Sequence, residues 1–213
     1  MTQRTINYLT LFCTVAVGFA VCLVVPPIEG LGDKVRIAFF HIPVAWVSVL
    51  AFTLSAYWAL RYLLSRKIAF DYKNAIAVKL GLIFCLLATF SGAAFAKMTW
   101  GAYWNWDPRQ TTIFILLLIY GANLALRSAI EDEEYRAKIA AVYSLLSVFT
   151  LPFLVFIIPR YYYSLHPSPI INNSGSLFID KILLYMLIIC VLICTAIFWR
   201  FFTYLMNLSI KRR

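Results

Sequence analysis

Two histidines and a cluster of tryptophans are the residues of this chain whose types could bind a ligand. Trp100, Trp104 and Trp106 lie within seven residues of one another, in a short polar break between two long apolar runs. His41 and His166 lie far from this break in the sequence, one on either side of it. Large rings offer stacking and apolar contact, and imidazoles can be axial ligands of haem iron. The pattern therefore indicates a surface for a flat, apolar, iron-bearing molecule, if the fold brings these residues together.

Each of these residues also has a simpler interpretation. Tryptophan and tyrosine gather at membrane interfaces without binding any ligand. A histidine near a membrane surface can bond to a neighbouring carbonyl instead of a metal. Asp107, followed by Pro108 and by Gln110 three residues after the cap, is typical of a helix N-cap. In that interpretation Asp107 acts on the site only by fixing where the next helix begins. Arg109 suits either a haem propionate or a lipid phosphate.

The composition predicts the kind of scaffold that would carry such a surface. The chain is 63% hydrophobic and only 13% charged, and its mean hydropathy is +0.83, whereas soluble domains are roughly 25% charged. An apolar run of about 20 residues is long enough to cross a bilayer as a helix. We therefore expect a single all-α integral membrane domain over residues 1–213, with six transmembrane helices at about 6–25, 37–60, 76–96, 111–129, 138–158 and 182–204.

The basic residues predict how these spans are oriented. The formal charge of +10 comes from residues scattered between the spans, which indicates membrane topology and not nucleic-acid binding. With the N-terminus inside, 13 of the 19 Lys and Arg residues fall on the inner side. We expect both termini to be cytoplasmic and the first apolar run to be a retained span, because it lacks a cleavage site. The outer connections are then 26–36, 159–181 and the tryptophan-rich loop (residues 97–110), with both histidines on their side.

The tryptophan-rich loop resembles a known signature. Trp100-Gly-x-Tyr103-Trp104-x-Trp106-Asp107 is similar to the "WWD" motif of haem-handling proteins in cytochrome c maturation, which include CcmC, CcmF and the CcsA proteins. The short chain, the six predicted spans and the segment from His41 through Pro43 to Trp46 most resemble the CcmC type, haem exporter protein C. Tyr103 stands where CcmC proteins commonly have tryptophan, and the pattern with tyrosine at this position is also found in CcsA-like proteins.

This resemblance implies a function and a site. CcmC-like proteins hold haem at the periplasmic face of the bacterial inner membrane and present it to the haem chaperone CcmE. The small protein CcmD assists them, and the ABC transporter CcmA/CcmB releases the loaded chaperone. The implied cargo is haem b, held transiently and without a covalent bond, and the protein is not an enzyme. The implied iron ligands are His41 and His166, and the implied haem-contacting residues are Trp100, Tyr103, Trp104, Trp106, Asp107 and Arg109.

Other functions share parts of this sequence pattern. A CcsA-like haem-handling subunit would share the same signature. A b-type cytochrome or a quinone-linked membrane subunit usually needs one histidine pair for each haem, and this chain has a single possible pair. A permease or purely structural subunit would use its aromatic residues only as an interfacial belt. A visible spectrum of the purified protein distinguishes a haem carrier from the last of these.

Overall fold

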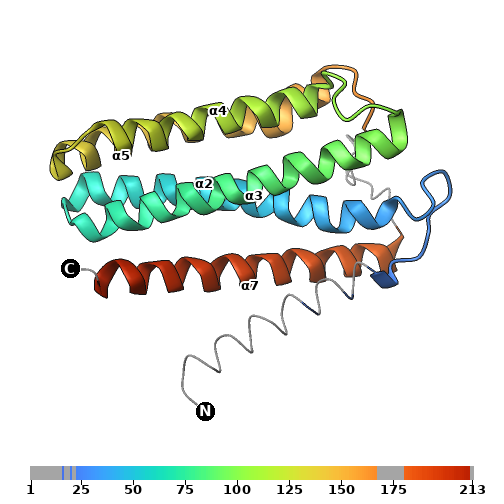
Figure 1. Cartoon of the computed structure of the whole chain (residues 1–213), viewed down its shortest axis with the longest axis horizontal. Helices are drawn as coiled ribbons and strands as arrows, with labels where there is room; N and C mark the ends of the chain where they lie inside the picture. Colours follow the sequence, from blue (N-terminus) through green and yellow to red (C-terminus); the bar gives the residue numbers. More distant parts are fainter. Residues whose placement is uncertain (1–15, 17–19, 21–22, 167–179, 212–213) are drawn as a thin grey trace, which may run out of the picture.

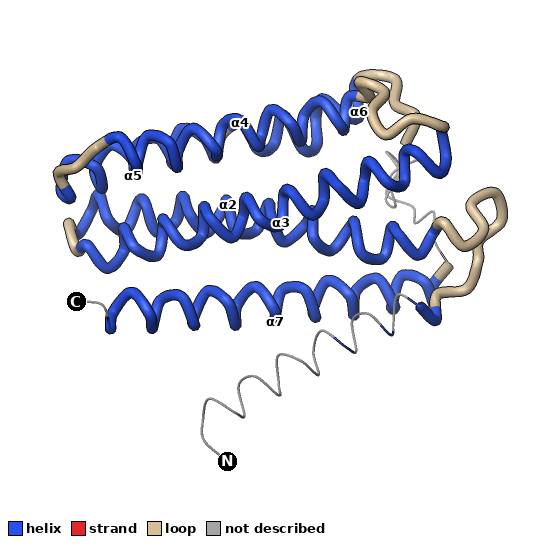
Figure 2. The backbone as a smooth tube through the Cα atoms, in the orientation of Figure 1, coloured by secondary structure: helices blue, strands red, loops and turns tan. Residues whose placement is uncertain are grey.

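The computed structural model describes residues 16, 20, 23–166 and 180–211, and helices dominate this part of the chain (Figures 1 and 2). In chain order the helices are α2 (Val35–Ser65), α3 (Ile68–Trp100), α4 (Pro108–Ala129), α5 (Glu133–Val148), the π-helix η1 (Pro152–Ile157), α6 (Ile158–Tyr161) and α7 (Lys181–Lys211). The expectation of an all-α protein is therefore confirmed for the described residues.

Five helical segments are long and apolar enough to cross a membrane. They are Val35–Ser65, Ile68–Trp100, Pro108–Ala129, Glu133–Tyr161 and Lys181–Ser209. These correspond to five of the six predicted spans. The first predicted span, residues 6–25, lies almost entirely outside the described residues. The span at residues 6–25, and with it the total of six, stays a prediction, as does the cytoplasmic location of the termini.

The helices extend further than the hydropathy pattern indicated. In the tryptophan-rich loop only residues 101–107 are non-helical, because α3 continues through Trp100 and α4 begins at Pro108. The fifth span begins at Glu133, where Asp132 caps α5 by accepting a 2.7 Å hydrogen bond from the Tyr135 N–H. At its other end α6 continues through Tyr161, into the range expected as a loop. A hydropathy pattern does not predict helix ends of this kind, because they extend beyond the apolar layer.

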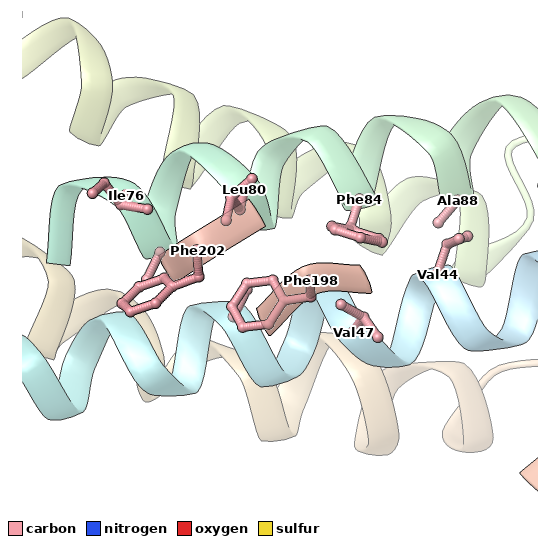
Figure 3. Packing of buried hydrophobic residues seen from close by; sticks show 10 residues of the cluster. Val44, Val47, Ile76, Leu80, Phe84, Ala88, Phe198 and Phe202 are labelled. Atoms are coloured by element: carbon pink, nitrogen blue, oxygen red, sulfur yellow. The ribbon is translucent and has the colours of Figure 1, made fainter. Parts of the chain in front are cut away.

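The helices pack in three layers (Figure 1). The α2–α3 pair forms the middle layer, with α4 and α5 on one side and α7 on the other. One buried cluster joins the middle layer to α7, where Phe198 and Phe202 pack against residues such as Val47 and Leu80 (Figure 3). A second cluster joins it to α4, where the rings of Phe52 and Tyr120 stack with centroids 3.6 Å apart.

Because successive helices run in opposite directions, the connections between them lie at two opposite ends of the bundle. The segment before α2, the connection between α3 and α4, and the segment after α6 lie at one end, which we call the ligand end (right in Figures 1 and 2). The short turns after α2 and α4 and the last residues of α7 lie at the opposite end. At that end Arg127 of α4 donates two hydrogen bonds, of 2.8 and 2.6 Å, to the buried Asp71 of α3. The ligand end thus receives residues from distant parts of the sequence.

Candidate functional site

The connection from α3 to α4 is a compact turn with a fixed shape. Gly101 ends α3 in the left-handed conformation, with φ of +85°, and its N–H donates to the Lys97 carbonyl. Lys97 in turn donates from Nζ to the Gly101 carbonyl at 2.8 Å. Trp106 also has a positive φ, of +54°, which is uncommon for an aromatic residue. These two reversals direct the chain from the end of α3 into the start of α4.

Asp107 holds the start of α4, as predicted, and it also holds the segment after α6. Its Oδ1 accepts a 2.9 Å hydrogen bond from the Arg109 N–H, which is the N-cap bond. Its Oδ2 accepts from the hydroxyl of Ser164 at 2.8 Å and from the Leu165 N–H at 2.7 Å. Oδ1 also lies 3.1 Å from His166 Nδ1. The expectation that Asp107 only orients the helix was therefore incomplete, because its carboxylate touches an expected iron ligand.

The charge of Asp107 is retained although the residue is buried. Burial by itself would raise the pKa of this carboxyl, but the hydrogen bonds from Arg109, Ser164 and Leu165 and the charge of His166 outweigh burial and lower the pKa. The side chain is therefore a carboxylate at neutral pH. It accepts hydrogen bonds and cannot donate them.

Gln110 stabilises the turn in a way that the capping-box pattern only partly predicted. A capping-box glutamine would reach back to the N–H of the cap residue itself. Here its Oε1 accepts from the Asn105 N–H at 2.8 Å, and its Nε2 donates to the Tyr103 carbonyl at 3.0 Å. The buried amide thus ties α4 to the middle of the turn and fixes the backbone that carries the indole rings.

His41 lies in the second turn of α2 and faces α3. Its Nδ1 is 3.0 Å from the Ala88 carbonyl oxygen and 3.1 Å from the Ser91 hydroxyl oxygen. A carbonyl oxygen can only accept, so the proton of the neutral ring is on Nδ1 and Nε2 keeps its lone pair. The ring lies directly over Gly92, where an added Cβ would be 2.9 Å from His41 Cε1. The glycine is therefore what allows the imidazole to approach the helix so closely.

His166 lies in the non-helical segment after α6 and faces the end of α3. Its ring centroid is 5.0 Å from that of Trp100, with the planes at 59°. Burial lowers the pKa of His166 to about 4, against the opposing effect of Asp107, and nearby Arg109 and His41 lower it further. The ring is therefore neutral at pH 7, and its Nδ1–H donates to the Asp107 carboxylate. Nε2 again keeps its lone pair.

The two imidazoles and one guanidinium share the same region of the ligand end. Arg109 lies within electrostatic range of both His41 and His166, and the two histidines lie within range of each other. Arg160, in α6, also lies within range of Arg109. The Nε of Arg109 is buried and, among the described residues, has no hydrogen-bond partner. Such a donor favours an anionic ligand, because an unpaired buried donor costs about 1–3 kcal/mol.

The indole rings form two groups. Trp100 packs edge-on against Phe95, with centroids 5.8 Å apart, and also contacts His166. In the described part of the chain, the ring contacts of Trp104 are with Trp106 at 5.7 Å and with Phe114 at 6.1 Å. Trp106 is 72% exposed. Tyr103 is also exposed, and its ring lies 5.6 Å from Lys97 Nζ. The structure thus brings Trp100 to the His166 imidazole and leaves the other rings at the outer edge of the site.

Several residues of this site carried no signal in the sequence. Ala88, Ser91 and Gly92 belong to an apolar run, and the acceptor that Ala88 supplies is a backbone carbonyl that any residue would have. Ser164 and Leu165 contact Asp107 only because the segment after α6 folds back onto the start of α4. Of these five residues, Ser164 alone is a polar residue close to a histidine in the sequence.

The arrangement has the chemistry of a site for a metal-bearing planar ligand. Two neutral imidazoles present unprotonated Nε2 atoms, which is the form that binds a metal. An indole ring beside one imidazole and exposed rings at the edge supply apolar surface. A buried guanidinium donor supplies an anion contact. Iron porphyrin combines all three requirements, since it offers two axial positions, a flat apolar ring and carboxylate side chains.

Comparisons with known proteins agree with this chemistry. The family model described as "Heme exporter protein C" matches residues 1–213. A heme exporter protein C of Bradyrhizobium diazoefficiens is 29% identical over 215 residues, covering 100% of this chain and 81% of the relative. A mitochondrial "cytochrome c biosynthesis ccmC-like" protein of Marchantia polymorpha is 28% identical over 168 residues, covering 78% and 71%. The heme exporter protein C of Escherichia coli K12 is 29% identical over 123 residues, covering 58% and 50%.

Proposed function

Because this chain belongs to the haem exporter protein C (CcmC) family of membrane haem-handling proteins, we propose that it binds haem b at its ligand end. The haem would be held transiently and without a covalent bond, between Nε2 of His41 and Nε2 of His166. The family supports a role in cytochrome c maturation. The observation that carries the proposal is that two distant histidines each use Nδ1 for a protein hydrogen bond and leave Nε2 for iron.

The basic residues of the ligand end suit the haem propionates. Arg109 offers a buried donor without a partner among the described residues, and the exposed Arg160 lies within electrostatic range of it. Two cations near each other repel unless an anion lies between them. We assign Arg109 the closer propionate contact and Arg160 the outer one. Snorkelling to lipid phosphate, the alternative for Arg109, is less favoured because its Nε is buried.

The exposure of the site suits a protein that passes its haem on. The side chain of His166 is 16% exposed, and Tyr103 and Trp106 of the tryptophan-rich loop are largely exposed. A carrier of this kind needs an accessible haem edge. We propose that the ligand end is the periplasmic face and that the receiving protein is the haem chaperone CcmE, with CcmD and CcmA/CcmB as further partners. These partners follow from family membership and not from a contact of this chain.

A visible spectrum tests the haem site. We expect the detergent-purified protein, supplied with haem, to give a Soret band and the sharp ferrous bands of bis-imidazole ligation. His41→Ala and His166→Ala should each lose the low-spin form, and the double variant should lose haem retention. The matched control is Trp58→Phe, which should retain haem as the wild type does. The ring of Trp58 stacks on Phe70 near the opposite end of the bundle. A wild-type protein that takes up no haem would overturn the proposal.

Handover needs a separate experiment. The haem-loaded protein, mixed with the haem-free soluble domain of CcmE, should form a complex that co-purifies and keeps the Soret band. Omitting haem should reduce this co-purification, because the haem edge forms part of the contact. Equal complex formation by the His41→Ala/His166→Ala double variant would show that haem is not part of the recognition.

A further inference from the structure

The two imidazoles differ in the group that accepts the hydrogen bond from their Nδ1–H. This difference has a consequence for haem release. His166 donates to the Asp107 carboxylate. His41 donates to two neutral oxygens, the Ala88 carbonyl and the Ser91 hydroxyl. The hydroxyl proton of Ser91 is itself directed to the Leu87 carbonyl at 2.7 Å, so at His41 this hydroxyl is an acceptor. One ligand therefore has an anionic partner and the other has only neutral ones.

An anionic acceptor strengthens a metal-bound imidazole. When Nδ1–H donates to a carboxylate, electron density shifts into the ring and the opposite nitrogen becomes more basic. A carbonyl or hydroxyl acceptor has a weaker effect, because hydrogen bonds to a charged group are roughly twice as strong as neutral ones. Asp107 is suited to this role, since it is only 4% exposed and is held by three further hydrogen bonds.

The placement of the two rings agrees with this difference. His41 belongs to a spanning helix and packs over Gly92, eight residues before α3 ends at Trp100. Eight residues correspond to about two helical turns. His166 packs against Trp100 itself, in the non-helical segment that follows α6. Haem moving out of the bundle would therefore leave the deeper ligand first and stay with the outer one.

We propose that Asp107 is a positioning residue that makes His166 the retained axial ligand of haem, and that His41 is the ligand exchanged at handover. This inference rests on the proposed haem-binding function. In the exchange, the bond between iron and His41 Nε2 breaks and its electron pair stays on the imidazole. A nitrogen or oxygen donor of the receiving protein then supplies the electron pair of the new bond. The oxidation state of the iron does not change, and no proton is transferred.

One substitution separates the two roles of Asp107. Asparagine caps helices about as well as aspartate and has nearly the same shape, so Asp107→Asn keeps the N-cap bond while removing the negative charge. Its amide nitrogen cannot accept the hydrogen bonds from Ser164 and Leu165 that Oδ2 accepts, so the melting curve of this variant is compared with that of the wild type. We expect Asp107→Asn to raise the midpoint potential of the bound haem, because the carboxylate favours the ferric state. Transfer of ferric haem to apomyoglobin, used as a haem trap, should accelerate about tenfold, the lower end of the effect of losing such a partner.

The matched control lies at the other ligand. Ser91→Ala removes one neutral acceptor from His41 and leaves the Ala88 carbonyl in place, so we expect it to change the midpoint potential and the release rate less than Asp107→Asn does. A second comparison uses His41→Gly and His166→Gly, each supplied with free imidazole. The His41 variant should regain slow release more fully, because the strong ligand is still in place.

The outcomes separate this inference from the function on which it depends. If wild-type protein binds no low-spin haem, the proposed function fails. If it binds haem through both histidines but Asp107→Asn matches the wild type in potential and release rate, only the inference fails. A larger effect of Ser91→Ala than of Asp107→Asn would assign the stronger ligand to His41. A circular-dichroism melting curve for each variant separates loss of fold from loss of ligand strength.

Discussion

At the scale of single residues, the site depends on how each imidazole is oriented and less on which residues surround it. His41 and His166 are chemically identical in the sequence, yet each has its Nδ1 fixed by a different element, so both present the same nitrogen to a ligand. Gly92 matters for the same reason, since it provides the space in which the His41 ring lies. A substitution that displaces either ring should therefore weaken haem binding.

Gly92→Ala should weaken haem binding although alanine favours a helix. The added Cβ would lie 2.9 Å from His41 Cε1 and 3.3 Å from its Nδ1, so the ring must move away from the Ala88 carbonyl. We expect at least a tenfold faster loss of haem, consistent with disturbing a partner of a metal ligand, measured by transfer to apomyoglobin. The control is Gly121→Ala in α4, where nothing lies within 4 Å of the added Cβ. Equal effects of the two substitutions would contradict this role for Gly92.

Trp104→Ala should weaken haem retention more than Trp58→Ala. Trp104 contacts Trp106 and Phe114 at the ligand end, whereas Trp58 packs against the cluster shared by α2, α3 and α7. Both substitutions remove a large ring, so both should lower the melting temperature in detergent. Only the first should lower the amount of haem retained per folded molecule. Comparable losses of haem would indicate general damage to the fold.

At the scale of elements, α4 is positioned by polar contacts at both of its ends. Its start is held by Asp107 and Gln110 at the ligand end, and its last turn by the pair between Arg127 and Asp71 at the opposite end. Between them the helix packs through an apolar face that includes Leu116 and Tyr120. Apolar packing alone tolerates sliding of one helix along another, whereas directional bonds at both ends resist it.

The pair between Arg127 and Asp71 should therefore matter to stability more than to ligand binding. Arg127→Gln leaves the Asp71 carboxylate buried without its cation, which costs about 3–5 kcal/mol when one partner of a buried pair is removed. The double variant Asp71→Asn/Arg127→Gln should recover most of this loss, because no charge remains buried. Melting temperatures in detergent test both expectations. A double variant less stable than Arg127→Gln would mean that the two side chains have other essential contacts.

At the scale of the whole molecule, the three layers bring the connection between α3 and α4 and the segment after α6 to one end of the bundle (Figure 1), and these two segments carry Asp107 and His166. The connections at the opposite end carry many of the basic residues, among them Arg66 and Lys67 in the turn between α2 and α3. Basic residues collect on the cytoplasmic side of membrane proteins. This distribution supports a periplasmic ligand end.

The orientation is directly testable by cysteine labelling. In a background with the native cysteines replaced by alanine, Tyr163→Cys introduces a thiol at an 88% exposed position of the ligand end. Ser128→Cys introduces one at an exposed position of the opposite end. A membrane-impermeant maleimide added to cells with a permeabilised outer membrane should label the first and spare the second until the inner membrane is lysed. The reverse pattern would contradict the proposed topology.

Much of this protein followed from the sequence because the relevant signals are local. The run of apolar residues predicted helices, the Asp107-Pro108 step predicted the start of α4, and the tryptophan signature predicted the family, which the family comparison confirmed. Helix ends were predicted less well. The polar turns of α3 and α5 extend beyond the apolar layer, where hydropathy has no information.

Only the tertiary structure decided how the site is made. The sequence by itself determined that two imidazoles and a group of indoles exist in a membrane protein of this family. It did not indicate that the Ala88 carbonyl would accept a hydrogen bond from His41, because every residue has a carbonyl and only the close approach of α2 to α3 selects this one. Nor did it indicate that Asp107 would meet His166, 59 residues further along the chain. Such contacts depend on how distant segments pack, and residue type and spacing do not encode that packing locally.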